Sequence, residues 1–126
     1  MTAVELVDTR NEQAAASMAE SYGRLTGRPG ACAVSRGVAH VIAMAGVANA
    51  WFDHAPMLLL SGAGSTATAG RGHFQDMDQV AIAASICQLA RTVDRADNLP
   101  RAFHRCHRPA AGEIKKSRVK ENSTCR

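Results

Sequence analysis

Hydrophobic residues recur along the chain with the spacings that helices and strands require. Between residues 10 and 26 the apolar positions fall at i, i+4, i+8 and i+11, which is one face of a helix; they are Ala14, Met18, Tyr22 and Leu25. Gly27 and Pro29 follow directly, and both residue types are typical of a helix end. The pattern therefore predicts a helix over 10–26 with this stripe facing the core.

The remaining hydrophobic runs predict strands and helices in alternation. We expect strands at 3–8, 31–35, 57–61 and 86–93, and helices at 38–52, at 76–85 and after Asp97 or Asn98. The run at 57–61 is apolar throughout, which is typical of a parallel strand covered on both faces. Strand–helix alternation favours an α/β fold, a parallel sheet flanked by helices.

Charge divides the chain in two. Residues 1–103 carry eight Lys/Arg against nine Asp/Glu, whereas residues 104–126 carry seven Lys/Arg against two Glu, so the net charge of +4 arises in the tail. A basic tail can bind nucleic acid or anionic lipid, but this one has no interleaved aromatics and no recognisable binding module. We expect a partial domain over 1–105, a disordered basic tail over 106–126, and neither nucleic acid nor membrane as a partner.

Other composition signals exclude several classes of protein. The longest strongly apolar run, 56–60, is too short to cross a bilayer, and the N-terminus carries Glu5 and Asp8 without an apolar signal-peptide core. We expect a cytoplasmic protein. The four cysteines form no C-x-x-C pair, and the His104–His107 cluster has no matching half-site elsewhere, so we predict no metal site.

Three ordered motifs carry a family resemblance. They are the Arg-x-Glu-Gln-x-Ala…Met-Ala-x-x-Tyr-Gly-Arg-x-Thr-Gly-x-Pro-Gly pattern from residue 10, the segment 46–56 ending in Asp-His-Ala-Pro, and Gly-Arg-Gly-His-Phe-Gln-Asp-Met-Asp-Gln-Val at 70–80. Together they resemble the pyrimidine-binding domain of thiamine diphosphate enzymes of the acetolactate synthase and benzoylformate decarboxylase branch. The resemblance spans about residues 5–105.

The resemblance implies a catalytic, cofactor-binding role for Glu12. In the family, the Glu of Arg-x-Glu-Gln shares a hydrogen bond with the ring nitrogen para to the exocyclic amine of the cofactor's pyrimidine. This bond favours the imino tautomer, whose nitrogen then takes the proton from the thiazolium carbon. The alternative is that Glu12 is an ordinary first-turn carboxylate, stabilised by the helix dipole.

Further site residues follow from the same resemblance. Gly37 and Val38 correspond to the family's Gly-Pro-Gly turn, where Val38 replaces the Pro and Ile42 stands at a position that is often Asn. We expect His40 to be a surface or turn residue rather than a replacement ligand. Phe74 and Gln75 correspond to a Phe-Gln pair on the substrate side of the cofactor. Loop packing for Phe74 and a solvated amide for Gln75 is the alternative.

The chain lacks parts that the family's activity needs. It starts at what resembles the family's second strand, the match stops near residue 105, and it has no Gly-Asp-Gly motif for diphosphate and Mg²⁺. We expect a fragment of an acetolactate synthase-like transferase or lyase acting on 2-oxo acids by decarboxylation or carboligation, inactive alone. Its cofactor would be thiamine diphosphate, with Mg²⁺ supplied by a domain absent from this chain.

Partners and rival functions follow from this view. We expect a homo-oligomer, or pairing with a diphosphate-binding domain of another chain. One alternative is a non-enzymatic assembly or regulatory module that pairs with full-length relatives. A second is an independent flavodoxin-like or nucleotide-binding domain, against which Gly62-Ala63-Gly64 lacks the third glycine of a dinucleotide-binding turn.

Overall fold

The computed structural model describes residues 5–68 and 70–111. In chain order the elements are α1 (Glu12–Thr26), β1 (Gly30–Val34), α2 (Val38–Phe52), β2 (Met57–Ser61), α3 (Gln79–Ala84), the 3₁₀ turn η1 (Ala96–Asn98) and α4 (Leu99–Ala111). None of the described helices is long and apolar enough to cross a membrane.

The first helix is fixed at both ends by local hydrogen bonds. The Asn11 side chain caps α1, because its Oδ1 accepts from the backbone N–H of Gln13 at 2.9 Å and of Ala14 at 3.3 Å. At the other end Gly27 adopts the left-handed conformation, and its N–H donates to the Gly23 carbonyl at 2.9 Å. These two caps set where Glu12, the first residue of α1, must lie.

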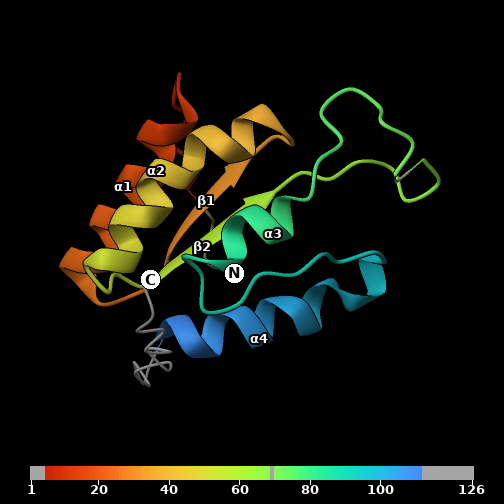
Figure 1. Ribbon diagram of the computed structural model, residues 1–126. Coiled ribbons are helices and arrows are strands. Elements are labelled where there is room, and N and C mark those ends of the chain that lie inside the picture. Colours follow the sequence, from red (N-terminus) through yellow and green to blue (C-terminus); the bar gives the residue numbers. More distant parts are fainter. Residues whose placement is uncertain (1–4, 69, 112–126) are drawn as a thin grey trace, which may run out of the picture.

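A parallel pair of strands forms the centre of the fold. β1 and β2 pair in register from Gly30 with Met57 to Val34 with Ser61, and α2 makes the crossover between them. Figure 1 shows α1 and α2 together on one side of the strands and α4 on the other side. The predicted α/β class, a parallel sheet flanked by helices, is confirmed.

The core is built from small side chains. Ala16 and Ala19 of α1, Cys32 of β1 and Ala43 of α2 form the buried cluster. α2 crosses α1 so closely that a Cβ atom on Gly46 would lie 2.5 Å from the Ala16 Cβ. Glycine at this position is therefore what lets the two helices touch.

Two predicted strands are wrong. In the described residues, 5–8 and 86–93 have no strand structure. A strand exists only where a neighbouring strand accepts its backbone hydrogen bonds, so β-favouring residues do not suffice. Leu6 and Val7 accordingly lie exposed. The predicted helix at 76–85 is shorter, at Gln79–Ala84.

The predicted buried stripe of the first helix is also wrong. Ala14, Met18, Tyr22 and Leu25 are all exposed, and α1 instead buries Ala16, Ala19, Glu20 and Gly23. Close packing on α2 and the strands requires small side chains, so the large residues point outward. The predicted helix after Asp97 or Asn98 is present as α4. Of the basic tail expected over 106–126, residues 106–111 belong to α4, and residues from 112 onward lie outside the described ones.

Candidate functional site

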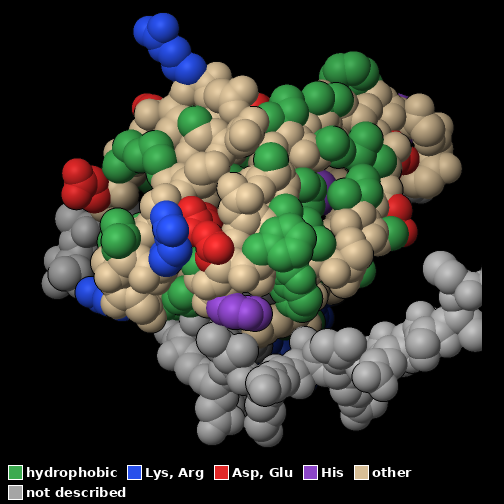
Figure 2. Space-filling view, turned by 60° about the vertical axis from the view of Figure 1, so that its left-hand side comes forward, with side chains coloured by type: hydrophobic (Ala, Val, Ile, Leu, Met, Phe, Trp, Pro, Cys, Tyr) green, Lys and Arg blue, Asp and Glu red, His purple; other side chains and the backbone are tan. Residues whose placement is uncertain are grey.

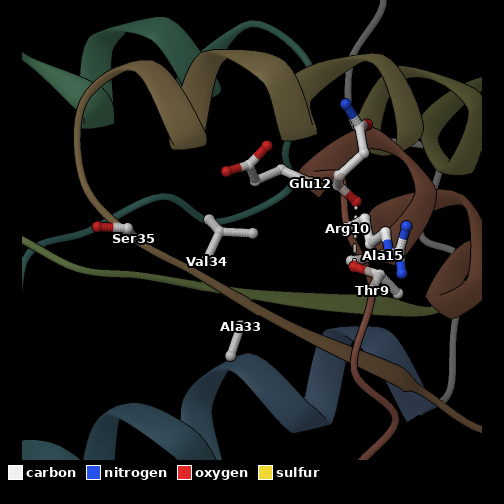
Figure 3. Close-up of a pocket in the computed structure, with 8 residues that line it drawn as sticks. Thr9, Arg10, Glu12, Ala15, Ala33, Val34 and Ser35 are labelled. Atoms are coloured by element: carbon white, nitrogen blue, oxygen red, sulfur yellow. Dashed lines mark hydrogen bonds between the residues drawn. The ribbon is translucent and has the colours of Figure 1, made fainter.

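Glu12 borders a hollow at the carboxyl end of β1. The hollow measures about 220 Å³ and is lined by eight residues from the start of α1 and the end of β1: Thr9, Arg10, Asn11, Glu12, Ala15, Ala33, Val34 and Ser35. In Figure 3 the Glu12 carboxylate extends from α1 over Val34, away from Arg10. The helix cap and the strand end thus place one carboxylate above the Val34 side chain, in a hollow whose other lining groups are largely polar.

The Glu12 carboxylate is available to a ligand. It is half-buried, and within the described residues it takes part in no side-chain hydrogen bond or ion pair. The free N–H groups and positive dipole end of α1 favour a negative charge at this position. The hollow is smaller than the ~300–1,000 Å³ pockets that enclose whole ligands, so its size suits part of a ligand, such as one aromatic ring.

Gly37 and Gln75 are brought together although 38 positions separate them in the sequence. Gly37 has φ 64° and ψ −115°, and a Cβ atom there would lie 2.8 Å from the Gln75 Cγ. Gln75 itself has φ 61°, in the left-handed region that non-glycine residues seldom adopt. The turn before α2 is therefore packed against the loop that carries the Phe-Gln pair.

The other predicted site residues face solvent. Val38 is 54% exposed, Ile42 is also exposed, and Phe74 is 81% exposed. Neither these three residues nor Gly37 and Gln75 line the Glu12 hollow. In this chain the predicted site residues therefore form two groups, the hollow at Glu12 and the contact of Gly37 with Gln75.

Gln79 links the ends of the two strands, and sequence reasoning gave it no role. Its Oε1 accepts from the Gly37 N–H at 2.8 Å, while its Nε2 donates to Ser61 Oγ at 2.8 Å and to the Gly62 carbonyl at 2.9 Å. The signal that could have found it is the Asp-Gln-Val end of the third motif, where an amide follows directly on the Asp78 helix cap.

Glu20 of α1 and His40 of α2 are buried polar side chains. His40, expected to be a surface or turn residue, is instead a helical residue only 4% exposed, and neither ring nitrogen has a hydrogen-bond partner in the described residues. Burial lowers the pKa of His40 below its usual 6.5. Glu20 is buried too, but its carboxylate lies 3.0 Å from the Arg24 Nε and accepts from Ser21 Oγ at 3.1 Å.

Comparison with known proteins gives a consistent result. Residues 1–82 match the family described as thiamine pyrophosphate enzyme, N-terminal TPP binding domain; thiamine pyrophosphate is another name for thiamine diphosphate. The chain is 33% identical over 97 residues to a 2-hydroxyacyl-CoA lyase of Arabidopsis thaliana, covering 77% of this chain and 17% of that protein.

Other relatives match over a similar region. An acetolactate synthase large subunit of Buchnera aphidicola is 35% identical over 100 residues, covering 79% of this chain and 18% of the relative. A 2-hydroxyacyl-CoA lyase 2 of Bos taurus is 36% identical over 96 residues, covering 76% of this chain and 15% of the relative. The chain therefore spans less than a fifth of the length of these relatives. With the family pattern matching most of its residues, the chain belongs to the thiamine pyrophosphate enzymes, within their N-terminal TPP-binding domain.

Proposed function

We propose that this chain binds the pyrimidine half of thiamine diphosphate through Glu12. The observation that carries the proposal is the Glu12 carboxylate, which projects over Val34 into a ring-sized hollow and is left unpaired by the described residues. A flat heteroaromatic ring with a hydrogen-bonding edge suits this combination of an unpaired carboxylate, polar lining groups and one apolar side chain. The family match supports the same cofactor.

The proposal assigns roles to Glu12, to the Asn11 cap and to Val34. The carboxylate of Glu12 accepts a hydrogen bond from the ring, and its position is fixed by the Asn11 cap. The half-buried Val34 side chain at the end of β1 offers an apolar surface on the side of Glu12, whereas Ala33 points to the other face of the strand. When bound, thiamine diphosphate supplies the nucleophilic carbon for reactions of 2-oxo acids, and the protein supplies position and electrostatics.

The proposed reaction class is that of an acetolactate synthase-like enzyme, decarboxylation or carboligation of 2-oxo acids. The sequence contains no Gly-Asp-Gly motif, so the diphosphate and Mg²⁺ would be held by a domain outside these 126 residues. The chain would then be inactive alone. It would act as a homo-oligomer or paired with the diphosphate-binding domain of another chain.

A chimaera tests this proposal. Residues 3–103 replace the matching region of the Buchnera acetolactate synthase large subunit, and acetolactate formation is measured. Glu12→Gln keeps the size of the side chain but removes the negative charge and the acid–base capacity. Loss of one positioned acid–base group costs about a hundred- to ten-thousand-fold in rate, and we expect a loss in that range.

Glu5→Gln is the matched control, because Glu5 is exposed and lies outside the hollow. We expect it to leave the rate unchanged. Equal rates for the Glu12→Gln variant and the parent chimaera would show that Glu12 is only a first-turn helix charge. A chimaera that is folded and inactive, and that Ile42→Asn does not restore, would also contradict the proposal.

A second candidate function is a non-enzymatic assembly module that pairs with full-length relatives. It is favoured by the large hydrophobic side chains that α1 and α2 expose, among them Leu25 at 83% and Phe52 at 74%. Figure 2 shows hydrophobic side chains spread over the face formed by these two helices. Mixing the chain with a full-length relative decides: a hetero-complex supports the module, and separate elution of both proteins excludes it.

A further inference from the structure

The amide of Gln79 reaches the carboxyl ends of both strands. Gln79 is the first residue of α3 and is half-buried. Its three hydrogen bonds, all between 2.8 and 2.9 Å, join the Gly37 N–H after β1 to Ser61 Oγ and the Gly62 carbonyl at the end of β2. One side chain therefore adds three hydrogen bonds at the point where the strand ladder ends, with Val34 beside Ser61.

The same contacts lead on to the floor of the Glu12 hollow. Ser61 Oγ donates to the Ser35 carbonyl at 3.2 Å, and the Gly62 N–H donates to the Val34 carbonyl at 3.0 Å. Val34 and Ser35 both line the hollow. Val34 is thus hydrogen-bonded to Gly62, and Ser35 to Ser61. Gln79 hydrogen-bonds both Gly62 and Ser61 directly.

Only a side chain with both a donor and an acceptor can make these contacts. The Gly37 N–H can only donate and the Gly62 carbonyl can only accept, so the orientation of the Gln79 amide is determined. A carboxylate at position 79 would face the Gly62 carbonyl with a second acceptor, and the resulting repulsion would draw the side chain away from the Gly37 N–H. A purely apolar side chain would leave both backbone groups without their partner.

Within the part of the chain that the structure describes, Gln79 supplies the side-chain hydrogen bond to the turn at Gly37. As the residue that precedes α2, Gly37 offers no side-chain cap, and its left-handed φ of 64° is a conformation that the local sequence does not enforce on its own. Gln75 packs against it on one side and the Gln79 Oε1 binds its N–H. The conformation of this turn therefore depends on contacts from residues 75–79.

We propose that Gln79 is a positioning residue, whose amide sets Val34, Ser35 and the Gly37 turn relative to Glu12 and so governs how tightly the pyrimidine ring is held. This rests on the proposed function of the Glu12 hollow. Gln79 need not touch the ring: it acts through Ser61 and Gly62, which hold the backbone of the hollow floor. Substitution should therefore weaken cofactor binding more than it affects the chemical step.

The test compares Gln79→Glu with Gln88→Glu. Both exchange an amide for a carboxylate, but Gln88 is exposed. In the full 126-residue chain, amide hydrogen exchange is measured at Gly37 and Gly62. We expect Gln79→Glu to speed exchange at Gly37 about tenfold, because the repelled side chain no longer holds the turn, and Gln88→Glu to leave it unchanged.

The second readout uses the chimaera with Mg²⁺ present. We expect Gln79→Glu to raise the thiamine diphosphate concentration at half-maximal rate about tenfold, with kcat at saturating cofactor within twofold of the parent. If Gln79 had only a structural role, Gln79→Glu would lower the melting temperature but would not raise the thiamine diphosphate requirement while leaving kcat unchanged. Should Gln79→Glu fail to fold, Ser61→Ala removes the hydroxyl that joins the Gln79 Nε2 to the Ser35 carbonyl and leaves the Gln79 bonds to Gly37 and Gly62 in place. A two- to fivefold rise in the thiamine diphosphate concentration at half-maximal rate is then expected.

Three outcomes overturn the proposal. They are unchanged exchange at Gly37 in Gln79→Glu, an equal effect of Gln88→Glu, and faster exchange with an unaltered requirement for cofactor. Failure of the proposed function looks different, since it appears as full activity of the Glu12→Gln chimaera whatever Gln79→Glu does to exchange at Gly37.

Discussion

Gly46→Ala tests whether the close contact of α1 and α2 sets the stability of this fold. A Cβ atom on Gly46 would lie 2.5 Å from the Ala16 Cβ and 2.7 Å from both the Ala16 carbonyl carbon and the Ser17 nitrogen. Carbon atoms in favourable contact lie about 3.5–4.0 Å apart. Because backbone atoms are among the obstacles, the helices must separate and no side-chain rotation relieves the clash.

The size of the effect follows from two opposing terms. Overpacking a tight interior costs about 1–3 kcal/mol, whereas replacing a glycine inside a helix by alanine gains roughly 0.5–1 kcal/mol. We expect net destabilisation of about 1–2 kcal/mol. Since α1 carries Glu12, the same shift also moves that carboxylate relative to the Val34 floor.

Urea unfolding in dilute solution, followed by circular dichroism, measures this change. With a slope of about 1–3 kcal/mol per molar urea, the midpoint should fall by roughly 1 M. Ala45→Ser is the control, because it also adds one heavy atom to α2 but at an exposed position, and it should change stability by about 0.5 kcal/mol or less. A midpoint that rises in Gly46→Ala, as helix propensity alone predicts, would refute the reasoning.

Three further predictions concern single groups. Asn11→Ala removes both cap hydrogen bonds and should cost about 1 kcal/mol in urea unfolding; a loss no greater than that of Gln13→Ala would contradict the capping role. Because burial lowers the pKa of His40, the free energy of unfolding should be constant above about pH 6.5 and fall as the pH drops through the lower folded-state pKa. If the melting temperature of a His40→Leu variant falls with pH as much as that of the parent chain, His40 is not the cause. Phe52→Lys should reduce self-association in sedimentation velocity, because Phe52 is 74% exposed; an unchanged sedimentation coefficient would show that this face does not mediate it.

The local sequence pattern was sufficient to predict an element where the contacts that define the element are between residues close in sequence. The helix at 38–52 and the strand at 57–61 are present with the predicted bounds, because periodicity and apolar runs report on the element itself. The wrong strand at 86–93 shows the limit of this reasoning, since a strand depends on a partner that its own residues do not specify.

A related cause explains why α1 buries its small residues and exposes the predicted hydrophobic stripe. The stripe of Met18, Tyr22 and Leu25 has the right period for a buried face, but period says nothing about the distance to the neighbouring helix. Here Gly46 and Ala16 bring the helices so close that only small residues fit between them. The hydrophobic residues that sequence reasoning assigns to the core are therefore left on the surface.

The same distinction between local and long-range contacts separates the site residues that sequence could predict from those it could not. Glu12 could be singled out from sequence because its place at a helix start is local, and a family motif contains it. Gln79 could not, because its partner Gly37 lies 42 positions earlier and the hydrogen bond exists only once α2 and α3 are packed. A motif preserves which residue types recur, whereas the structure determines which backbone atoms they reach. It follows that Gln79 at the end of the Asp-Gln-Val segment belongs with Gly37 and Ser61, as one hydrogen-bonded group that supports the floor beneath Glu12.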